Sequence, residues 1–276
     1  MIRRTFLTGL LTVGLGLATA FSHADSTPFP PQLTEVKAEF AKPFAKYQVK
    51  GTFVMLDGQT GRYSVYNLER ASERKMPAST FKLFNSLVAF DTGALKDDRE
   101  VIAWDGVERD FTSWNRDMNI RDAIRVSNVP FYQELARRIG REKMQAALNQ
   151  VGYGNKMIGR EIDQFWLDNT LQISAKEQVD FVMRLARGKL PFSARAIDMV
   201  QQISILERTP SYVLHGKTGW GGRATTPGVG WWTGYLERGD KLYAFAMNMD
   251  MQKLEDAPLR LKIAKQIMLQ QGLIEE

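Results

Sequence analysis

Hydrophobic residues recur at two spacings along this chain, and the two spacings predict different elements. From residue 31 to 47 the apolar positions fall three or four residues apart, which predicts an amphipathic helix. The segments 51–56 and 62–68 are rich in β-branched and aromatic residues, and Asp-Gly and Thr-Gly turn signals separate them. We therefore expect one helix followed by two neighbouring strands.

The middle of the chain, from about 79 to 205, returns to the helical spacing. The predicted helices are 79–91, 130–138, 141–150, 175–187 and 193–204. Strand patterns follow at 211–217, 229–237 and 241–249, and a last amphipathic helix follows at about 258–271.

This order of elements predicts a mixed α/β fold. Strands joined by tight turns form antiparallel sheets, so we expect one antiparallel sheet completed from both ends of the chain. Helices at the amino and carboxyl ends flank it, and a mainly helical part is inserted between its halves. The sheet part covers about 25–70 and 205–276, and the helical part about 71–204. The cleft between two such parts is where a binding site is expected.

The amino terminus predicts export. An apolar run from about 6 to 21 follows two arginines and ends in small residues, which indicates a signal peptide over 1–24. We expect cleavage after Ala24, with Ala20 as the second choice. The segment Arg3–Leu7 also resembles a twin-arginine signal, so the Sec and twin-arginine routes both stay open. The run is short for a membrane span and no second one follows. We expect 25–276 to be one soluble domain in the periplasm, without a membrane partner.

Charge and composition exclude several kinds of partner. Hydrophobic residues make up 44% of the 276 residues, enough for a packed core. The net charge of +6 falls to +4 without the signal peptide, and it is spread along the chain without a nucleic-acid motif. A solvated basic surface is expected, with no nucleic-acid partner. The oligomeric state, monomer or homodimer, stays open.

The absence of cysteine and the scarcity of histidine narrow the chemistry. Without cysteine the chain has no disulfide, no thiol nucleophile and no lipid anchor on cysteine. Of two histidines, His23 lies in the signal peptide, which leaves His215 and excludes a histidine-rich metal site. The alternation around His215 is typical of a strand, and no Gly-x-Ser-x-Gly elbow is present. A nucleophile here needs another base.

Ser79 and Lys82 are the first candidates for that chemistry. Three residues apart at a predicted helix start, they share one face, within reach of each other. A lysine activates a serine only when it is neutral or modified, and the apolar neighbours of Lys82 disfavour its charge. A second Ser-x-x-Lys, Ser72 to Lys75, is surrounded by charge, so Lys75 is expected to stay solvated.

Two further motifs follow in order. Ser127-Asn128-Val129 lies in a loop before a helix that begins near Pro130, where a helix cap is the alternative interpretation. Lys217-Thr218-Gly219 is expected at the end of a strand, and Gly219 would let a substrate approach the backbone closely. A phosphate-binding loop is disfavoured because Ser211 stands where it needs glycine. The three motifs together have the layout of the penicillin-recognising serine enzymes.

The chain resembles the class D serine β-lactamases, the oxacillinase family, over essentially all of its mature length. The main family elements are Ser79–Lys82, Ser127–Val129, Tyr153–Asn155, Phe165–Leu167 and Lys217–Gly219. Weaker matches are Trp104–Gly106, Gly230–Trp232 and Pro258–Arg260. Class A is disfavoured because Val129 stands where its Ser-Asp-Asn motif has asparagine.

The resemblance implies that Ser79 attacks the β-lactam ring and that Lys82 is the base. In this family the lysine is carboxylated by carbon dioxide or bicarbonate, so no dissociable cofactor or metal is expected. The modified Lys82 would serve in acylation and deacylation, and the indole of Trp166 would hold it by a hydrogen bond. Backbone N–H groups of Ser79 and Trp220 would form the oxyanion hole.

The resemblance also implies roles for the remaining motif residues. Ser127, near Lys217, would pass a proton to the ring nitrogen that leaves. Thr218 and Arg260 would bind the substrate carboxylate, beside the Gly219 backbone. Val129 and Leu167 complete the set of substrate-binding residues, and they would form an apolar cover over the base.

One departure and two alternatives accompany this interpretation. The family often continues Trp-Leu-Glu-Gly-Ser, whereas Asp168-Asn169-Thr170 follows here, which leaves the loop and the substrate range open. A penicillin sensor shares the motifs but would be tethered by transmembrane helices. A cell-wall DD-peptidase is disfavoured by Phe165-Trp166-Leu167. Repeated turnover of a cephalosporin would distinguish a hydrolase from both.

Overall fold

The computed structural model describes residues 27–222 and 228–275. The predicted signal peptide, 1–24, therefore lies outside the described residues, as does the segment 223–227. Among the helices in the described ranges, none combines the length and the apolar character needed to cross a membrane.

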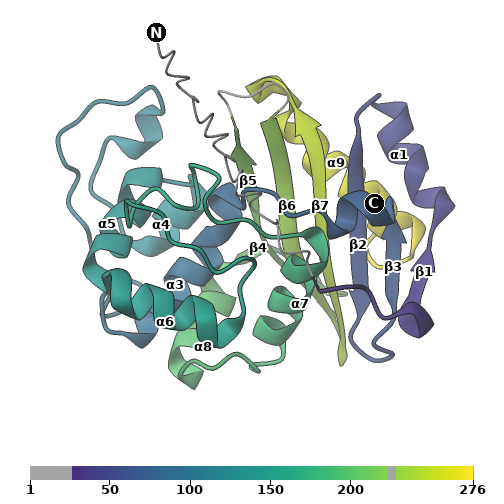
Figure 1. Ribbon diagram of the computed structural model, residues 1–276, viewed down its shortest axis with the longest axis horizontal. Helices are drawn as coiled ribbons and strands as arrows, with labels where there is room; N and C mark the ends of the chain where they lie inside the picture. Colours follow the sequence, from purple (N-terminus) through teal and green to yellow (C-terminus); the bar gives the residue numbers. More distant parts are fainter. Residues whose placement is uncertain (1–26, 223–227, 276) are drawn as a thin grey trace, which may run out of the picture.

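The centre of the described fold is a seven-stranded sheet (Figure 1). Its strands are β1 (Thr34–Val36), β2 (Gly51–Asp57), β3 (Tyr63–Tyr66), β4 (Ile205–Arg208), β5 (Val213–Gly221), β6 (Gly228–Arg238) and β7 (Lys241–Met251). They lie in the order β1-β3-β2-β7-β6-β5-β4. Because β2 pairs with β7, strands from both chain ends meet in the middle of the sheet, as predicted. Every pair is antiparallel except β1 with β3, which is parallel.

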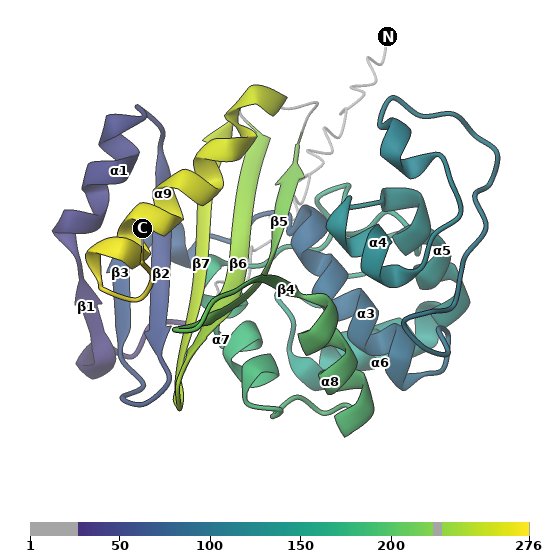
Figure 2. The same cartoon turned by 180° about the vertical axis from the view of Figure 1, so that it is seen from behind.

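Helices cover both faces of this sheet and form a separate group at one side. The helices in the described chain are α1 (Ala41–Lys46), α2 (Leu68–Ser72), α3 (Lys82–Asp91), α4 (Ile120–Arg125), α5 (Val129–Ile139), α6 (Arg141–Val151), α7 (Ala175–Ala186), α8 (Ala194–Ile203) and α9 (Ala257–Gln270). Helices α1 and α9 lie on one face, and α7 lies on the other (Figures 1 and 2). Helices α3 to α6 and α8 gather beside β4 and β5. The predicted mixed α/β class is confirmed.

Two hydrophobic clusters follow this division. One lies between the sheet and α1 and α9, and includes Phe44, Trp232 and Ile263. The larger one fills the helical part and reaches the opposite sheet face, where Trp231 belongs to it. Trp231 and Trp232 are neighbours on β6 and point to opposite faces because side chains alternate along a strand. The predicted site motifs lie where these two hydrophobic clusters meet the sheet.

The amphipathic helix predicted over 31–47 is wrong in its first half. A 3₁₀ turn begins at Pro31, β1 follows, and the α-helix starts only at Ala41. Phe40 and Phe44 are buried as the spacing predicts, but Val36 is 61% exposed. Residues 34–36 pair with β3 at the sheet edge, so strand pairing overrides the local helical pattern.

Strand β5 is longer than predicted and changes the place of one motif. It continues to Gly221, so Lys217-Thr218-Gly219 lies within the strand instead of at its end. Pairing with β6, where Gly219 lies opposite Trp231, carries the strand through a glycine-rich segment of low strand propensity. The short elements β4, α2 and α4 were not predicted, because each has only four to six residues.

Candidate active site

The predicted nucleophile lies in a tight turn at the start of α3. Ser79 belongs to a 3₁₀ turn, Ala78–Phe81, and Lys82 is the first residue of the α-helix that follows. Ala78 has φ +49°, a left-handed conformation that residues with a Cβ seldom adopt. Ser79 is half-buried. The turn therefore presents the serine hydroxyl from a strained backbone.

Lys82 lies beside Ser79 in a dry environment. Its Nζ donates a hydrogen bond to Ser79 Oγ at 2.7 Å, and the side chain is fully buried. Burial holds the pKa of the Lys82 amine well below its usual range, and the nearby charge of Lys217 lowers it further. The ring of Tyr132 lies 5.2 Å from Nζ. An amine that has lost its charge at this place would be able to take a proton from the serine hydroxyl.

The second Ser-x-x-Lys motif lies in a different environment. Lys75 Nζ forms an ion pair with Glu73 at 2.7 Å, and the Glu73 side chain is largely exposed. The Lys75 side chain is 20% exposed, so it is less buried than Lys82 but not fully solvated as expected.

The face of β5 that carries Lys217 and Gly219 lies against the nucleophile turn. A Cβ built on Gly219 would come within 3.0 Å of Pro77 O and 3.2 Å of the backbone nitrogens of Ser79 and Thr80. Glycine permits this close approach, whereas a Cβ would require the turn or the strand to shift by a few tenths of an ångström. We expected a substrate to approach the backbone closely at Gly219. In the structure, the group that approaches Gly219 is the protein's own backbone at Ser79.

Lys217 and Arg260 are a cationic pair at β5, in which Lys217 is buried and Arg260 is half-buried. Lys217 is buried, and its Nζ donates to Thr218 O at 3.0 Å. Burial, and then the charge of Arg260, lowers the pKa of Lys217 to about 7. Burial also lowers the pKa of Arg260 to about 10.

Arg260 reaches β5 from α9, which covers the sheet face opposite the one that carries Lys217 and Gly219. Its Nη1 donates to Gly219 O at 2.6 Å and its Nε donates to Ala257 O at 2.9 Å. Gly230 leaves it room, since a Cβ there would lie 3.1 Å from Arg260 Cδ. Strand alternation directs Thr218 and Trp220 to this same face, and Trp220 packs on the α9 cluster.

Ser127 and Val129 flank the start of α5. Ser127 has φ +56°, another left-handed residue. Asn128 caps α5 by accepting a hydrogen bond from Phe131 N at 3.0 Å, so the capping interpretation of this motif holds for its asparagine. Val129 is the half-buried first residue of the helix. Within the described residues, no hydrogen bond joins Ser127 to Ser79, Lys82 or Lys217.

Trp166 and Leu167 come from the loop between α6 and α7. Trp166 is fully buried and stacks on Phe81 with ring centroids 5.2 Å apart. Its indole N–H has no hydrogen-bond partner in the described part of the chain, which is costly for a buried donor. Leu167 is half-buried and packs on the larger cluster.

Two aromatic residues near the site had no role in the sequence interpretation. Trp231 donates from Nε1 to Met76 O at 2.8 Å, which ties β6 to the nucleophile turn. Tyr132 lies on α5, three residues after Val129, and this helical spacing is the one signal that could have indicated it.

His215 has the structural role that its strand position predicts. It is buried in β5 and stacks on Tyr235 with ring centroids 4.2 Å apart. Burial lowers the pKa of His215 to about 4, so the ring is neutral at pH 7. Its Nδ1 lies 3.0 Å from Gln201 O. The imidazole therefore does not serve Ser79.

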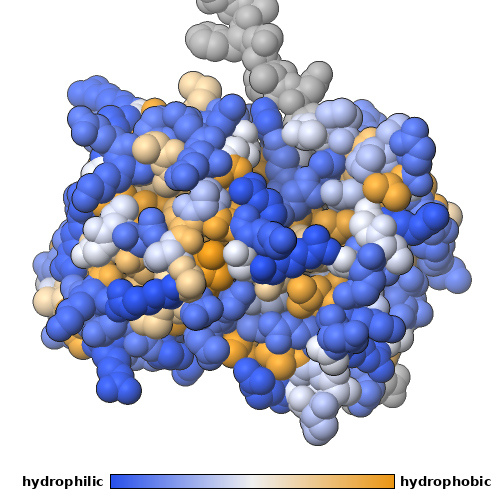
Figure 3. All heavy atoms as spheres, turned by 90° about the horizontal axis from the view of Figure 1, so that it is seen from below, coloured by the Kyte–Doolittle hydropathy of each residue, from blue (hydrophilic) through white to orange (hydrophobic). Residues whose placement is uncertain are grey.

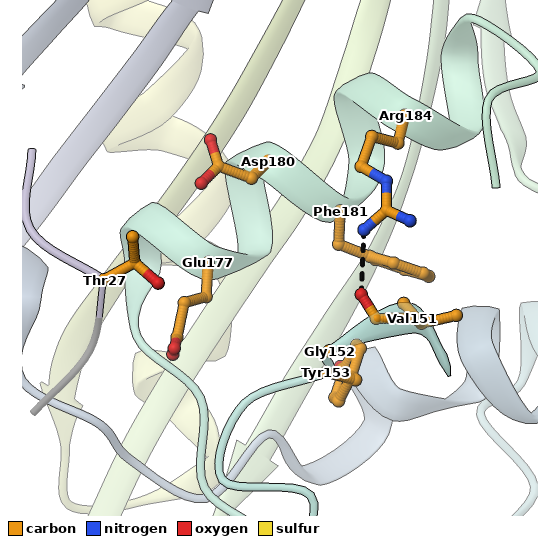
Figure 4. A pocket seen from close by; sticks show the side chains of 8 residues that line it. All are labelled: Thr27, Val151, Gly152, Tyr153, Glu177, Asp180, Phe181 and Arg184. Carbon is orange, nitrogen blue, oxygen red and sulfur yellow. Dashed lines mark hydrogen bonds between the residues drawn. The ribbon is translucent and has the colours of Figure 1, made fainter. Parts of the chain in front are cut away.

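A cavity of about 180 Å³ lies elsewhere, beside α7 (Figure 4). The side chains that line it include Glu177, Asp180 and Arg184, and none of the predicted site residues is among them. Arg184 Nη1 donates to Val151 O at 2.8 Å. Polar residues cover most of the face in Figure 3, with hydrophobic ones in small groups among them.

Comparisons with known proteins agree on one group of enzymes. The penicillin-binding protein transpeptidase domain family matches residues 51–269. β-Lactamase OXA-5 of Pseudomonas aeruginosa is 42% identical over 235 residues, which cover 84% of this chain and 88% of the relative.

Two solved structures are similar over most of this chain. The class D β-lactamase YbXI from Nostoc is 46% identical, with a TM-score of 0.83 over 85% of this chain and 99% of the other. The class D β-lactamase FUS-1 (OXA-85) of Fusobacterium nucleatum is 40% identical, with a TM-score of 0.85 over 87% and 100%.

Proposed function

The chain belongs to the class D β-lactamases, serine hydrolases that open β-lactam rings and so confer antibiotic resistance, and from this premise we propose how its residues perform the reaction. We propose that Ser79 is the nucleophile and that Lys82, carboxylated on Nζ by dissolved carbon dioxide, is the general base. The observation that carries this proposal is the fully buried Lys82 amine, 2.7 Å from Ser79 Oγ.

The surroundings of Lys82 fit a carboxylated side chain. Carbon dioxide reacts with a neutral amine, and burial lowers the pKa of this one. A carbamate carries two acceptor oxygens, and the buried Trp166 indole N–H is a donor without a partner. We propose that Trp166 donates to the modified lysine, which removes the cost of burying that N–H unpaired.

Acylation then follows from the positions of the side chains. Ser79 gives its hydroxyl proton to the modified Lys82, and Oγ attacks the β-lactam carbonyl carbon. The backbone N–H groups of Ser79 and Trp220 stabilise the oxyanion. The carbon–nitrogen bond of the ring breaks, and Ser127 gives its proton to the nitrogen. The proton that the modified Lys82 took from Ser79 then passes to Ser127, so Ser127 is a hydroxyl again and the modified Lys82 is free to act as the base in deacylation. The left-handed backbone at Ser127 and the cap of α5 by Asn128 fix the position of the Ser127 backbone, from which the hydroxyl extends.

Deacylation returns the enzyme to its starting state. Water loses a proton to the modified Lys82 and attacks the ester carbonyl, and Ser79 leaves with a proton. Val129 and Leu167, both half-buried, cover the base and limit access of bulk water to it. Because no histidine is available at this site, one modified lysine serves both steps.

Substrate binding uses the cationic pair. Thr218 and Arg260 hold the carboxylate that penicillin-type substrates carry, and Lys217 adds a second positive charge. We propose penicillins as the preferred class and the periplasm as the place of action. The support for the latter is the signal-like segment 1–24.

Removal and return of carbon dioxide tests the role of Lys82. Acid treatment and degassing should abolish hydrolysis of a chromogenic cephalosporin, and bicarbonate should restore it. The Lys82→Ala variant should not respond, whereas Lys75→Ala should respond like the wild type because Lys75 pairs with Glu73 outside the pocket. Activity that is indifferent to bicarbonate would remove the carbamate from the mechanism.

A further inference from the structure

The nucleophile turn is held firmly on the side that faces the sheet. Ala78 keeps a left-handed backbone, which persists only where the surroundings impose it. Trp231 donates to Met76 O at 2.8 Å, and Gly219 packs against the backbone of Ser79. Both supports come from β5 and β6. The other side of the turn faces α7.

A buried amide on α7 holds that other side. Gln178 Nε2 donates to Thr80 Oγ1 at 2.7 Å, and Thr80 Oγ1 donates to Pro77 O at 2.7 Å. Gln178 and Thr80 are both fully buried. This chain of hydrogen bonds fixes the residues on both sides of Ser79, two positions before it and one position after it.

The amide itself stands on a rigid support. One residue before it, Glu177 closes a capping box with Ser174 at the start of α7. Arg74 Nη2 pairs with Glu177 Oε1 at 2.5 Å, and both side chains are largely buried. The first turn of α7 is therefore fixed on two sides, and Gln178 projects from it.

Tyr153 completes a small polar island in an aromatic core. Its fully buried ring packs on Phe84 and Phe181, with ring centroids 4.9 Å and 5.1 Å away. Its hydroxyl faces Thr80 and Gln178. Neither the Tyr153 hydroxyl nor Gln178 Oε1 has a well-aligned hydrogen-bond partner in the described residues. Unpaired polar groups in an apolar interior lower stability, and apolar side chains would fill the same space without that cost. The presence of these polar groups therefore points to a role other than stability.

We propose that Gln178 is a positioning residue for the nucleophile. It touches neither substrate nor reacting atoms. Through Thr80 it keeps the strained turn in place, so that Ser79 Oγ stays 2.7 Å from Lys82 Nζ. This inference rests on the proposed function, because it takes Ser79 as the group that is acylated.

Two isosteric variants remove the interaction from either end. Gln178→Met deletes the donor and Thr80→Val deletes the hydroxyl, while Thr80→Ser keeps it. Gln201→Met is the matched control, because Gln201 Nε2 donates to Leu185 O at 2.8 Å, near the other end of α7. The measurements are the rate constant for acylation under single-turnover conditions, the mass of the peptide that carries Ser79, and the thermal unfolding temperature.

We expect Gln178→Met and Thr80→Val each to slow acylation about 10- to 100-fold, as a small displacement of a nucleophile does. The double variant should be no slower than the slower single variant, because both remove one interaction. Thr80→Ser should acylate within about threefold of the wild type. Gln201→Met should lose thermal stability while its acylation rate stays unchanged.

The outcomes separate this inference from the proposed function. If the wild type is acylated at Ser79 and Gln178→Met is acylated at the same rate while folded, the positioning role is wrong. It is equally wrong if Gln201→Met slows acylation as much, or if the double variant shows the product of the two single effects. Acylation of the wild type at a residue other than Ser79 would refute the proposed function itself.

Discussion

Replacement of Gly219 by alanine tests the closeness of β5 to the nucleophile turn. The added Cβ would lie 3.0 Å from Pro77 O and 3.2 Å from the backbone nitrogens of Ser79 and Thr80. Favourable contacts of carbon lie at about 3.5–4.0 Å, so these contacts are too short by roughly 0.3–1 Å. All three atoms belong to the backbone of the nucleophile turn, so no flexible side chain can move aside.

The expected loss follows from that misfit. Overpacking costs about 1–3 kcal/mol, which should lower the free energy of unfolding by that amount if nothing else moves. If the turn at Ser79 moves instead, displacement of the nucleophile should slow acylation about 10-fold or more. Stopped-flow acylation and chemical denaturation measure the two effects separately.

A second glycine provides the control. Gly188 has φ +63° and no atom near its missing side chain, so Gly188→Ala should cost about 1–2 kcal/mol of stability through backbone strain alone. Its acylation rate should stay at the wild-type value. If Gly219→Ala acylates as fast as the wild type, the contact between β5 and the nucleophile turn does not position Ser79.

Three further results are expected. Trp166→Ala should slow deacylation more than acylation, so that acyl-enzyme accumulates in rapid-quench mass spectrometry; unchanged deacylation would exclude Trp166 as a partner of the base. The pKa of Lys217 is about 7 in the folded protein and near 10.5 when unfolded, so the unfolded chain binds more protons between these values and stability should rise with pH there. Lys217→Met should therefore raise the free energy of unfolding most below pH 7, which denaturation curves at several pH values measure. A stabilisation that grows as pH rises would contradict this expectation. Arg260→Ala should raise KM for penicillins far more than it lowers kcat, and equal effects on a substrate without a carboxylate would show that Arg260 acts elsewhere.

Local patterns predicted the parts of the site that depend on neighbouring residues. Ser79 and Lys82 are three apart, so one turn of helix brings them together whatever the rest of the chain does. Most of the longer helices and strands were also predicted, because the hydrophobic pattern that indicates an element is a local property of the sequence. The motif at Lys217 was found, but its place inside β5 was not, because pairing with β6 extends the strand.

Long-range packing decides the parts that the sequence did not predict. The hydrogen bond of Gln178 to Thr80 spans 98 residues, and that of Arg260 to Gly219 spans 41. No local pattern encodes such meetings. The left-handed backbones of Ala78 and Ser127 give no signal either, since neither residue is glycine. The resemblance to a family implied a role for Arg260, whereas Gln178 became visible only in three dimensions.

The pairing of β2 with β7 has a consequence for how the protein is made. Gly51 lies opposite Met249, so partners in the middle of the sheet are separated by about 200 residues of chain. Contacts this distant form slowly, and until β7 has been delivered one edge of β2 stays open to wrong partners. In a chain that is still being synthesised, this edge of β2 therefore stays unpaired until nearly the whole sequence has been made.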